Sequence, residues 1–177
     1  DAAAPIARGG RSAGCRSTTT QVMAVAAAIA TSTEAAVQRR QRGGSFVAAF
    51  DEGSFAGVTA RTMPAVEALA LLPPRVRLVL AGGYDPDLPE NVEHARELEE
   101  LAARLGVADR VTQRRSVSGD EKARLLARCA CLLYTPENEH FGIVPLEAMH
   151  ARTPVVAVDS GGPRESVVDG VTGRLLA

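Results

Sequence analysis

The fold is decided by residues 131–158, which read CLLYTPENEHFGIVPLEAMHARTPVVAV. The apolar runs at residues 131–134 and 154–158 have the length and composition of buried β-strands. Between them, residues 144–150 have the spacing of a helix. Because both strands are apolar throughout, instead of alternating with polar residues, they indicate a parallel sheet that is covered on both faces.

Strands and helices alternate in the same way through most of the chain. The predicted strands are at residues 45–50, 77–83, 111–113 and 173–176, and the other predicted helices are at residues 62–72, 91–105 and 118–128. Pro64 is tolerable in the first turn of its helix, and Ser118 followed by Glu121 has the spacing of a capping box. We therefore expect an α/β fold, a Rossmann-like parallel sheet with helices on both faces. Ligands of such sheets bind beyond the carboxyl ends of the strands.

Residues 1–44 differ in composition from the rest of the chain. They are rich in Ala, Ser, Thr, Gly and Arg, and they contain neither Leu nor an aromatic residue. With so little large apolar surface to bury, they are predicted to form a disordered tail, although residues 21–40 have a high helix propensity. An Arg- and Ser-rich composition is also typical of organelle targeting segments, which we keep as an alternative. The folded domain is then expected at residues 45–177.

The composition excludes several classes of function. The 20 Lys and Arg residues are balanced by 21 Asp and Glu residues, which leaves a net charge of −1 at pH 7. A nucleic-acid binder usually has a basic excess and aromatic side chains for stacking, but aromatic residues make up 3% here and Trp is absent. We therefore expect no nucleic-acid partner. No run reaches the roughly 20 apolar residues of a membrane-spanning helix.

Two smaller features of the composition also bear on chemistry. Cys129 and Cys131 have no histidine at metal-binding spacing, so we expect buried thiols and no metal site. Lys122 is the only lysine among the 20 basic residues. We attribute this preference for arginine to codon composition, because it runs through the whole chain.

Glu139 and Glu147 have the most informative spacing. Glu139 lies in the loop after the strand at residues 131–134, and Glu147 lies about one turn into the next helix. The N-terminus of that helix offers unpaired N–H groups and a partial positive charge, which suit a diphosphate. Glu147 is then placed to accept two hydrogen bonds from a ribose diol, and Glu139 points toward the group beyond the diphosphate. Gly142 would let backbone amides approach hydroxyl groups closely.

In this stretch the chain resembles glycosyltransferase family 4, whose members are retaining enzymes of the two-domain GT-B fold. The E-x7-E motif is met by Glu139 and Glu147, and the GG-P-E turn is met at residues 161–165. The segments CACLLYTPENEHFGIVPLEAM and LAGGYDPDLPENVEH are similar to eukaryotic mannosyltransferases of dolichol-linked oligosaccharide assembly. The resemblance covers about residues 77–176, with the motifs in the same order as in the family.

The resemblance implies the donor-binding, C-terminal half of an enzyme that transfers mannose from GDP-mannose to a dolichol-linked oligosaccharide, with α-1,3/1,6 specificity and retention. It implies that Glu139 is the catalytic residue, which orients the sugar and stabilises positive charge, and that Glu147 holds the ribose. The other donor-binding residues that we assign are His140, Phe141, Gly142, Ile143, Gly82, Gly83, Arg61 and Arg115. The resemblance implies no cofactor besides the donor substrate. It also implies a location at the cytosolic face of the endoplasmic reticulum membrane, with membrane association only through parts missing from this chain.

The chain departs from the family after its first strand. There the family usually carries an Arg and a Lys that clamp the diphosphate, whereas residues 51–63 read DEGSFAGVTARTM, with no lysine. Arg61 alone could substitute, with its register shifted by one. A missing cation would weaken diphosphate binding and leaving-group stabilisation.

Several alternatives stay open on the sequence alone. Asp85-Pro86-Asp87 imitates a DxD metal site, but Pro between two Asp after two glycines is ordinary turn chemistry, which we favour. Arg114 and Arg115 either contact the guanine or are solvated. The acceptor-binding half has no room before residue 45, so we expect the chain alone to be inactive. The alternative function is a non-catalytic nucleotide-sugar-binding fragment or remnant, and a sugar-nucleotide epimerase of the same fold is less favoured.

Overall fold

The structure is a computed structural model of the chain that describes residues 23, 25–29, 31, 46–51, 59–136 and 140–176. The strands in this part are β1 (Phe46–Asp51), β2 (Arg77–Gly82), β3 (Val111–Arg115), β4 (Cys131–Tyr134), β5 (Val155–Val158) and β6 (Gly173–Leu176). The helices are α2 (Thr59–Ala70), α3 (Pro89–Arg104), α4 (Gly119–Arg128), α5 (Ile143–His150) and α6 (Pro163–Ser166), with a 3-10 turn η1 (Ala108–Arg110).

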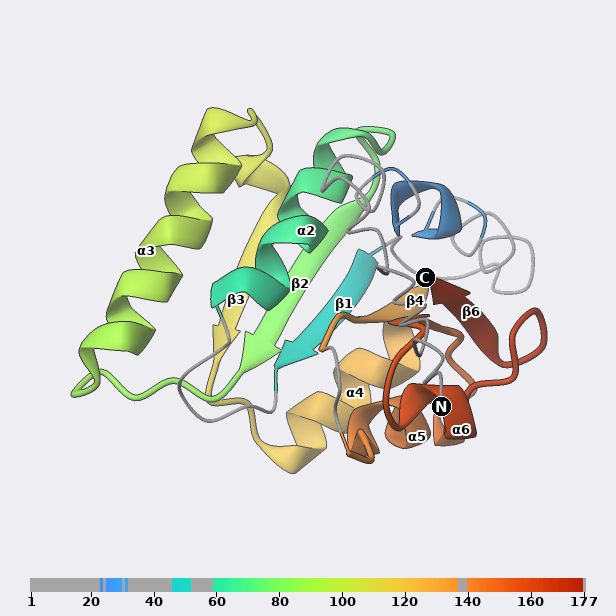
Figure 1. Ribbon diagram of the computed structural model, residues 1–177. Helices are drawn as coiled ribbons and strands as arrows, with labels where there is room; N and C mark the ends of the chain where they lie inside the picture. Colours follow the sequence, from blue (N-terminus) through green and yellow to red (C-terminus); the bar gives the residue numbers. More distant parts are fainter. Residues whose placement is uncertain are drawn as a thin grey trace, which may run out of the picture.

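All the pairings between these strands are parallel, and the sheet has the order β3-β2-β1-β4-β5-β6 (Figure 1). The chain moves outward from β1 to β3, returns to the middle, and then moves outward in the other direction from β4 to β6. The order therefore reverses between β1 and β4. In a doubly wound sheet a ligand binds in the crevice at this point, beyond the carboxyl ends of the two strands.

The helices cover the two faces of the sheet separately. Figure 1 shows α2 and α3 on one side of the sheet and α4 and α5 on the other. The buried residues divide in the same way, because neighbouring residues of a strand point to opposite faces. Leu133 and Val156 pack into the cluster that contains α2 and α3 residues, whereas Leu132 and Val155 pack into the cluster that contains α5 residues. The predicted α/β fold with helices on both faces is confirmed.

The helix ends follow the capping residues that the sequence provides. Ser118 precedes α4, and its hydroxyl accepts a hydrogen bond of 3.2 Å from the Glu121 N–H, as the capping-box spacing predicts. After α3 the chain turns at Gly106, whose φ is +69°. Glycine adopts this left-handed conformation without the steric cost that a Cβ adds, so it ends the helix.

The structure differs from the prediction most clearly at three places. Helix α2 begins at Thr59, which places Pro64 inside the helix and not in its first turn. Strand β3 continues to Arg115, because Ala81 and Gly82 of β2 offer pairing partners for Arg114 and Arg115. The turn at residues 161–165 contains the short helix α6, which Pro163 opens.

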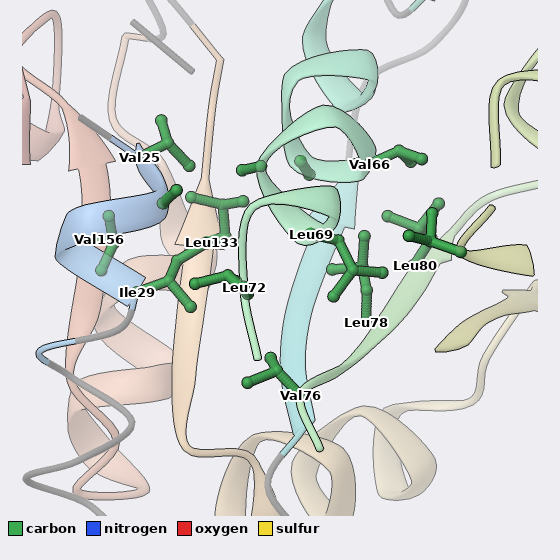
Figure 2. Packing of buried hydrophobic residues seen from close by; sticks show 14 of the residues in the cluster. Val25, Ile29, Val66, Leu69, Leu72, Val76, Leu78, Leu80, Leu133 and Val156 are labelled. Atoms are coloured by element: carbon green, nitrogen blue, oxygen red, sulfur yellow. The ribbon is translucent and has the colours of Figure 1, made fainter. Parts of the chain in front are cut away.

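Part of the predicted tail belongs to the core. Residues 25–29 are helical, and the side chains of Val25, Ala26, Ala28 and Ile29 are buried in the same cluster as Leu133 and Val156. Figure 2 shows Val25 and Ile29 beside these strand residues. The prediction of a disordered tail is therefore wrong for residues 25–29, because an apolar helical stripe of Val, Ala and Ile has a sheet face to pack on. Most of residues 1–44 lie outside the described part of the chain.

Candidate functional site

The crevice between β1 and β4 is bordered by the start of α5. Gly142 precedes α5 with a φ of +70°, and Tyr134, the last residue of β4, lies beneath it with 2% of its surface exposed. A Cβ on residue 142 would lie 3.1 Å from Tyr134 Oη. Glycine is needed here both for its left-handed backbone and for its lack of a side chain.

The segment before α5 contacts the second glycine motif through the backbone. A Cβ on Gly162 would overlap the backbone carbonyl of Phe141, so only glycine fits at this position. The two motifs that the sequence showed separately, at residues 139–147 and 161–165, therefore meet at one point. This contact places the backbone of residues 140–142 directly beside α6.

The start of α5 is open on its outer side. Phe141 is 63% exposed, Ile143 is 52% exposed, and His140 is exposed as well. No side chain of the described residues caps α5. The first N–H groups of a helix have no partner within the helix, and they carry a partial positive charge. Together with the exposed segment, they form a surface that suits an anionic group.

Glu147 lies in the second turn of α5 and faces α4. Lys122 Nζ, from the first turn of α4, is 2.6 Å from Glu147 Oε2. The contact is a close charge pair and not an aligned hydrogen bond, because none of the described residues donates to Oε2 at hydrogen-bonding angles. The Lys122 side chain is 19% exposed and that of Glu147 is 39% exposed. Oε2 itself is buried, so the exposed surface belongs to the rest of the Glu147 side chain.

A second group of predicted residues lies at the ends of β2 and β3. Gly82, Gly83 and Arg115 share one pocket, which is lined by Thr62, Leu80, Ala81, Gly82, Gly83, Tyr84, Asn91, His94, Ala95, Leu98, Gln113, Arg114 and Arg115. The Arg115 guanidinium lies 4.4 Å from the centre of the Tyr84 ring, and it also approaches the Glu99 carboxylate at 3.3 Å. Arg115 is therefore held by the protein itself and is not simply solvated.

The structure thus collects the predicted residues into two groups on either side of β1. His140, Phe141, Gly142, Ile143 and Glu147 form the group at β4 and α5, and Gly82, Gly83 and Arg115 form the group at β2 and β3. Arg61 lies in the first turn of α2, but its side chain is not described. Glu139 lies outside the described residues.

Sequence reasoning missed two residues that the structure places at these groups. Tyr84 supplies the ring under Arg115, and Lys122 supplies the cation beside Glu147. Tyr84 follows the predicted glycine pair directly, which could have identified it. For Lys122 the available signal was its uniqueness in a chain that otherwise uses arginine.

The structure shows where the residues of the possible metal sites lie in the described part of the chain. The Asp87 N–H donates a 2.9 Å hydrogen bond to Asp85 Oδ1, which is the favoured turn. Within the described part of the chain, no three His, Cys, Asp or Glu side chains are grouped to hold a metal ion. Burial raises the pKa of the Cys131 thiol far above its usual value, and the nearby Cys129 adds to this shift. Both cysteines are buried, as predicted.

Comparison with known proteins identifies the family. Residues 63–177 match the family model of glycosyl transferases group 1, a stretch that includes most of α2 and every later element described above. The chain belongs to this family. Over 101 residues it is 54% identical to the alpha-1,3/1,6-mannosyltransferase ALG2 of Mus musculus, an alignment that covers 57% of the chain and 24% of the relative. The chain thus spans about a quarter of that relative's length, and the resemblance to mannosyltransferases is confirmed.

Solved structures of glycosyl transferases share the fold. Anabaena HepE in complex with UDP-glucose superposes with a TM-score of 0.65 at 28% identity, covering 82% of this chain and 38% of that chain. The C-terminal domain of the group 1 glycosyl transferase LpcC from Francisella tularensis superposes with a TM-score of 0.61 at 20% identity, covering 81% and 73%. The parallel sheet is therefore that of a GT-B glycosyl transferase. Among the described residues no helix has the length and apolar character to cross a membrane.

Proposed function

We propose that the chain is the donor-binding domain of a mannosyltransferase that takes mannose from GDP-mannose and transfers it, with retention, to a dolichol-linked oligosaccharide. The names of its relatives support the sugar and the linkage. The observation that carries the proposal is the start of α5, where Gly142 opens a helix at the reversal of strand order with Glu147 one turn further on.

The described residues at the start of α5 support nucleotide binding on physical grounds. The diphosphate is held by the N–H groups and the partial positive charge at the N-terminus of α5. The carboxylate of Glu147 then accepts hydrogen bonds from the ribose hydroxyls. Hydrogen bonds to a charged acceptor are worth about 1.5–3 kcal/mol, so this contact is expected to matter for affinity. Because the leaving group of the transfer is the nucleoside diphosphate, the same N–H groups also stabilise the charge that develops on it.

The catalytic step is assigned to residues at the edge of the described part of the chain. Glu139 orients the mannose and stabilises the positive charge of an oxocarbenium-like transition state. Arg61, in the first turn of α2, supplies the diphosphate with a cation. The acceptor is held by a second domain, at the cytosolic face of the endoplasmic reticulum membrane.

Calorimetric titration of the chain with GDP-mannose, GDP and UDP tests the donor assignment. We expect GDP and GDP-mannose to bind more tightly than UDP, and Glu147→Ala to weaken GDP binding by about tenfold or more. Glu100→Ala, which removes an exposed carboxylate from α3, is the control and should bind GDP like the wild type. Equal binding of GDP and UDP would refute the guanine assignment. No binding of any nucleotide would favour the remnant.

Transfer activity tests the catalytic assignment in the intact two-domain enzyme. We expect Glu139→Ala to abolish transfer of radiolabelled mannose to the lipid-linked acceptor while GDP binding persists. Transfer at the wild-type rate would remove Glu139 from the mechanism.

A further inference from the structure

Lys122 is placed where helix electrostatics do not favour a cation. It lies in the first turn of α4, whose N-terminus carries a partial positive charge that disfavours a nearby ammonium group by about 0.3–1 kcal/mol. Asp120 and Glu121 in the same turn offset part of this repulsion. The Lys122 ammonium group nevertheless reaches across to α5 and contacts Glu147. The contact with Glu147 is therefore one place to look for a role of this ammonium group.

The pair gives little stability that would explain the placement. An ion pair between partly exposed side chains contributes about 0–1 kcal/mol, because solvent screens the charges and two side chains lose rotational freedom. Both partners here are partly exposed. The pair does orient the carboxylate, because Nζ lies 2.6 Å from Oε2, and Oε2 is buried. The other oxygen, Oε1, is left for a ligand.

The choice of lysine over arginine agrees with this geometry. Every other basic residue of the chain is an arginine. A guanidinium group tends to bind both carboxylate oxygens through two parallel hydrogen bonds, whereas an ammonium group is a compact charge that can hold one oxygen. An arginine at position 122 would therefore compete with a ligand for Oε1, and a lysine would not.

We propose that Lys122 is a positioning residue of the donor site, which acts through Glu147. Its ammonium group holds Oε2 and so presents Oε1 to the ribose hydroxyls of the nucleotide. The inference rests on the proposed function, since it takes Glu147 as the ribose ligand. It adds a residue on α4 to a donor site that was assigned to the strand ends, α2 and α5.

Titration with GDP and 2′,3′-dideoxy-GDP tests this role, because the two nucleotides differ only in the ribose hydroxyls. We expect the wild-type chain to prefer GDP by about tenfold or more, as a site that hydrogen-bonds the hydroxyl groups of a ligand discriminates against a ligand that lacks them. Lys122→Met, which loses the charge, and Lys122→Arg, which keeps it, should both reduce this preference to about twofold. In both variants GDP binding weakens, while dideoxy-GDP binding changes by less than about twofold.

Two controls separate positioning from other roles. Arg124→Met removes an exposed charge from the same helix and should keep the wild-type preference. Thermal unfolding should show that both Lys122 variants are folded. If Lys122→Arg keeps the wild-type preference and Lys122→Met loses affinity for both nucleotides equally, Lys122 acts as a general attraction for phosphate and the positioning role is refuted. An unchanged preference in both variants refutes it as well. If the wild-type chain binds neither nucleotide, the proposed function itself fails, whereas a wild-type preference for GDP that both Lys122 variants keep refutes only the positioning role.

Discussion

At the scale of single residues, two glycines with nearly the same φ allow the cost of a left-handed backbone to be distinguished from the cost of a steric clash. Gly106 and Gly142 have φ values of +69° and +70°, but a Cβ meets nothing within 4 Å at Gly106 and meets the Tyr134 ring at Gly142. Gly106→Ala is expected to lower the free energy of unfolding by about 1–2 kcal/mol, which is the cost of a left-handed backbone. Gly142→Ala should cost about 1 kcal/mol more, because the added methyl crowds Tyr134. Urea unfolding of both variants measures the difference.

The same comparison extends to ligand binding. Gly142→Ala disturbs the start of α5, so it should also weaken GDP binding, whereas Gly106→Ala lies at the far end of α3 and should not. Equal losses of stability in the two variants would show that the Tyr134 ring moves to accommodate the added methyl group. If Gly106→Ala also weakened GDP binding, the weaker binding of Gly142→Ala could not be attributed to the start of α5.

Residue-level reasoning from the sequence predicted the glycine before α5 more readily than the side-chain contacts around it. Gly142 was predicted because local glycine chemistry is visible in the sequence. Its contact with Tyr134, and that of Gly162 with Phe141, depend on packing between separate elements. The Lys122–Glu147 pair joins two helices whose relative placement no local pattern encodes. For this reason Lys122 was noticed only as an exception in composition.

At the scale of elements, Arg110 ties the end of α2 to the start of β3. Its guanidinium donates to the carbonyls of Leu69 at 2.6 Å, Pro73 at 3.0 Å and Leu72 at 3.2 Å. Cations and hydrogen-bond donors stabilise the C-terminal end of a helix, where carbonyls lack partners. We expect Arg110→Met to lower the free energy of unfolding by about 1–2 kcal/mol in urea titrations.

Arg77→Met is the matched control for Arg110→Met. Arg77 makes a single exposed contact of 3.3 Å with the Asp109 carbonyl, so its loss should change the unfolding free energy by less than about 0.5 kcal/mol. A loss as large for Arg77 as for Arg110 would mean that charge alone, and not the capping of α2, determines the effect.

The helices and strands were largely predictable from the sequence, but the residues at which they begin and end were less predictable. Continuous apolar runs identify β4 and β5, because a strand buried on both faces cannot alternate with polar residues. The start of α2 was placed too late because Pro64 is usually tolerated in a first turn, whereas here the helix continues on the N-terminal side of it. The last two residues of β3 were missed because arginines give no apolar signal, and their place is set by pairing with β2.

At the scale of the whole molecule, the reversal of strand order leaves one face of β4 and β5 without cover from α2 and α3. Helices α2 and α3 pack over β1 to β3, and α4 and α5 lie on the opposite face (Figure 1). Leu133 of β4 and Val156 of β5 point to the face of α2, where the helical residues 25–29 join their cluster (Figure 2). Composition alone could not predict this, because the apolar stripe of residues 25–29 is short and becomes stabilising only against a sheet face.

Two serine substitutions on this helical segment test whether it is part of the folded domain. Ile29 is 2% exposed, whereas Ala27, two residues earlier, is exposed. Ile29→Ser removes a buried side chain and places a hydroxyl group in the core, so it should lower the free energy of unfolding by about 3 kcal/mol or more. Ala27→Ser should change it by less than about 0.5 kcal/mol, because position 27 faces solvent. Urea unfolding of both variants would measure this difference. Equal and negligible effects would mean that the domain folds without residues 25–29, and that Leu133 and Val156 are covered in some other way.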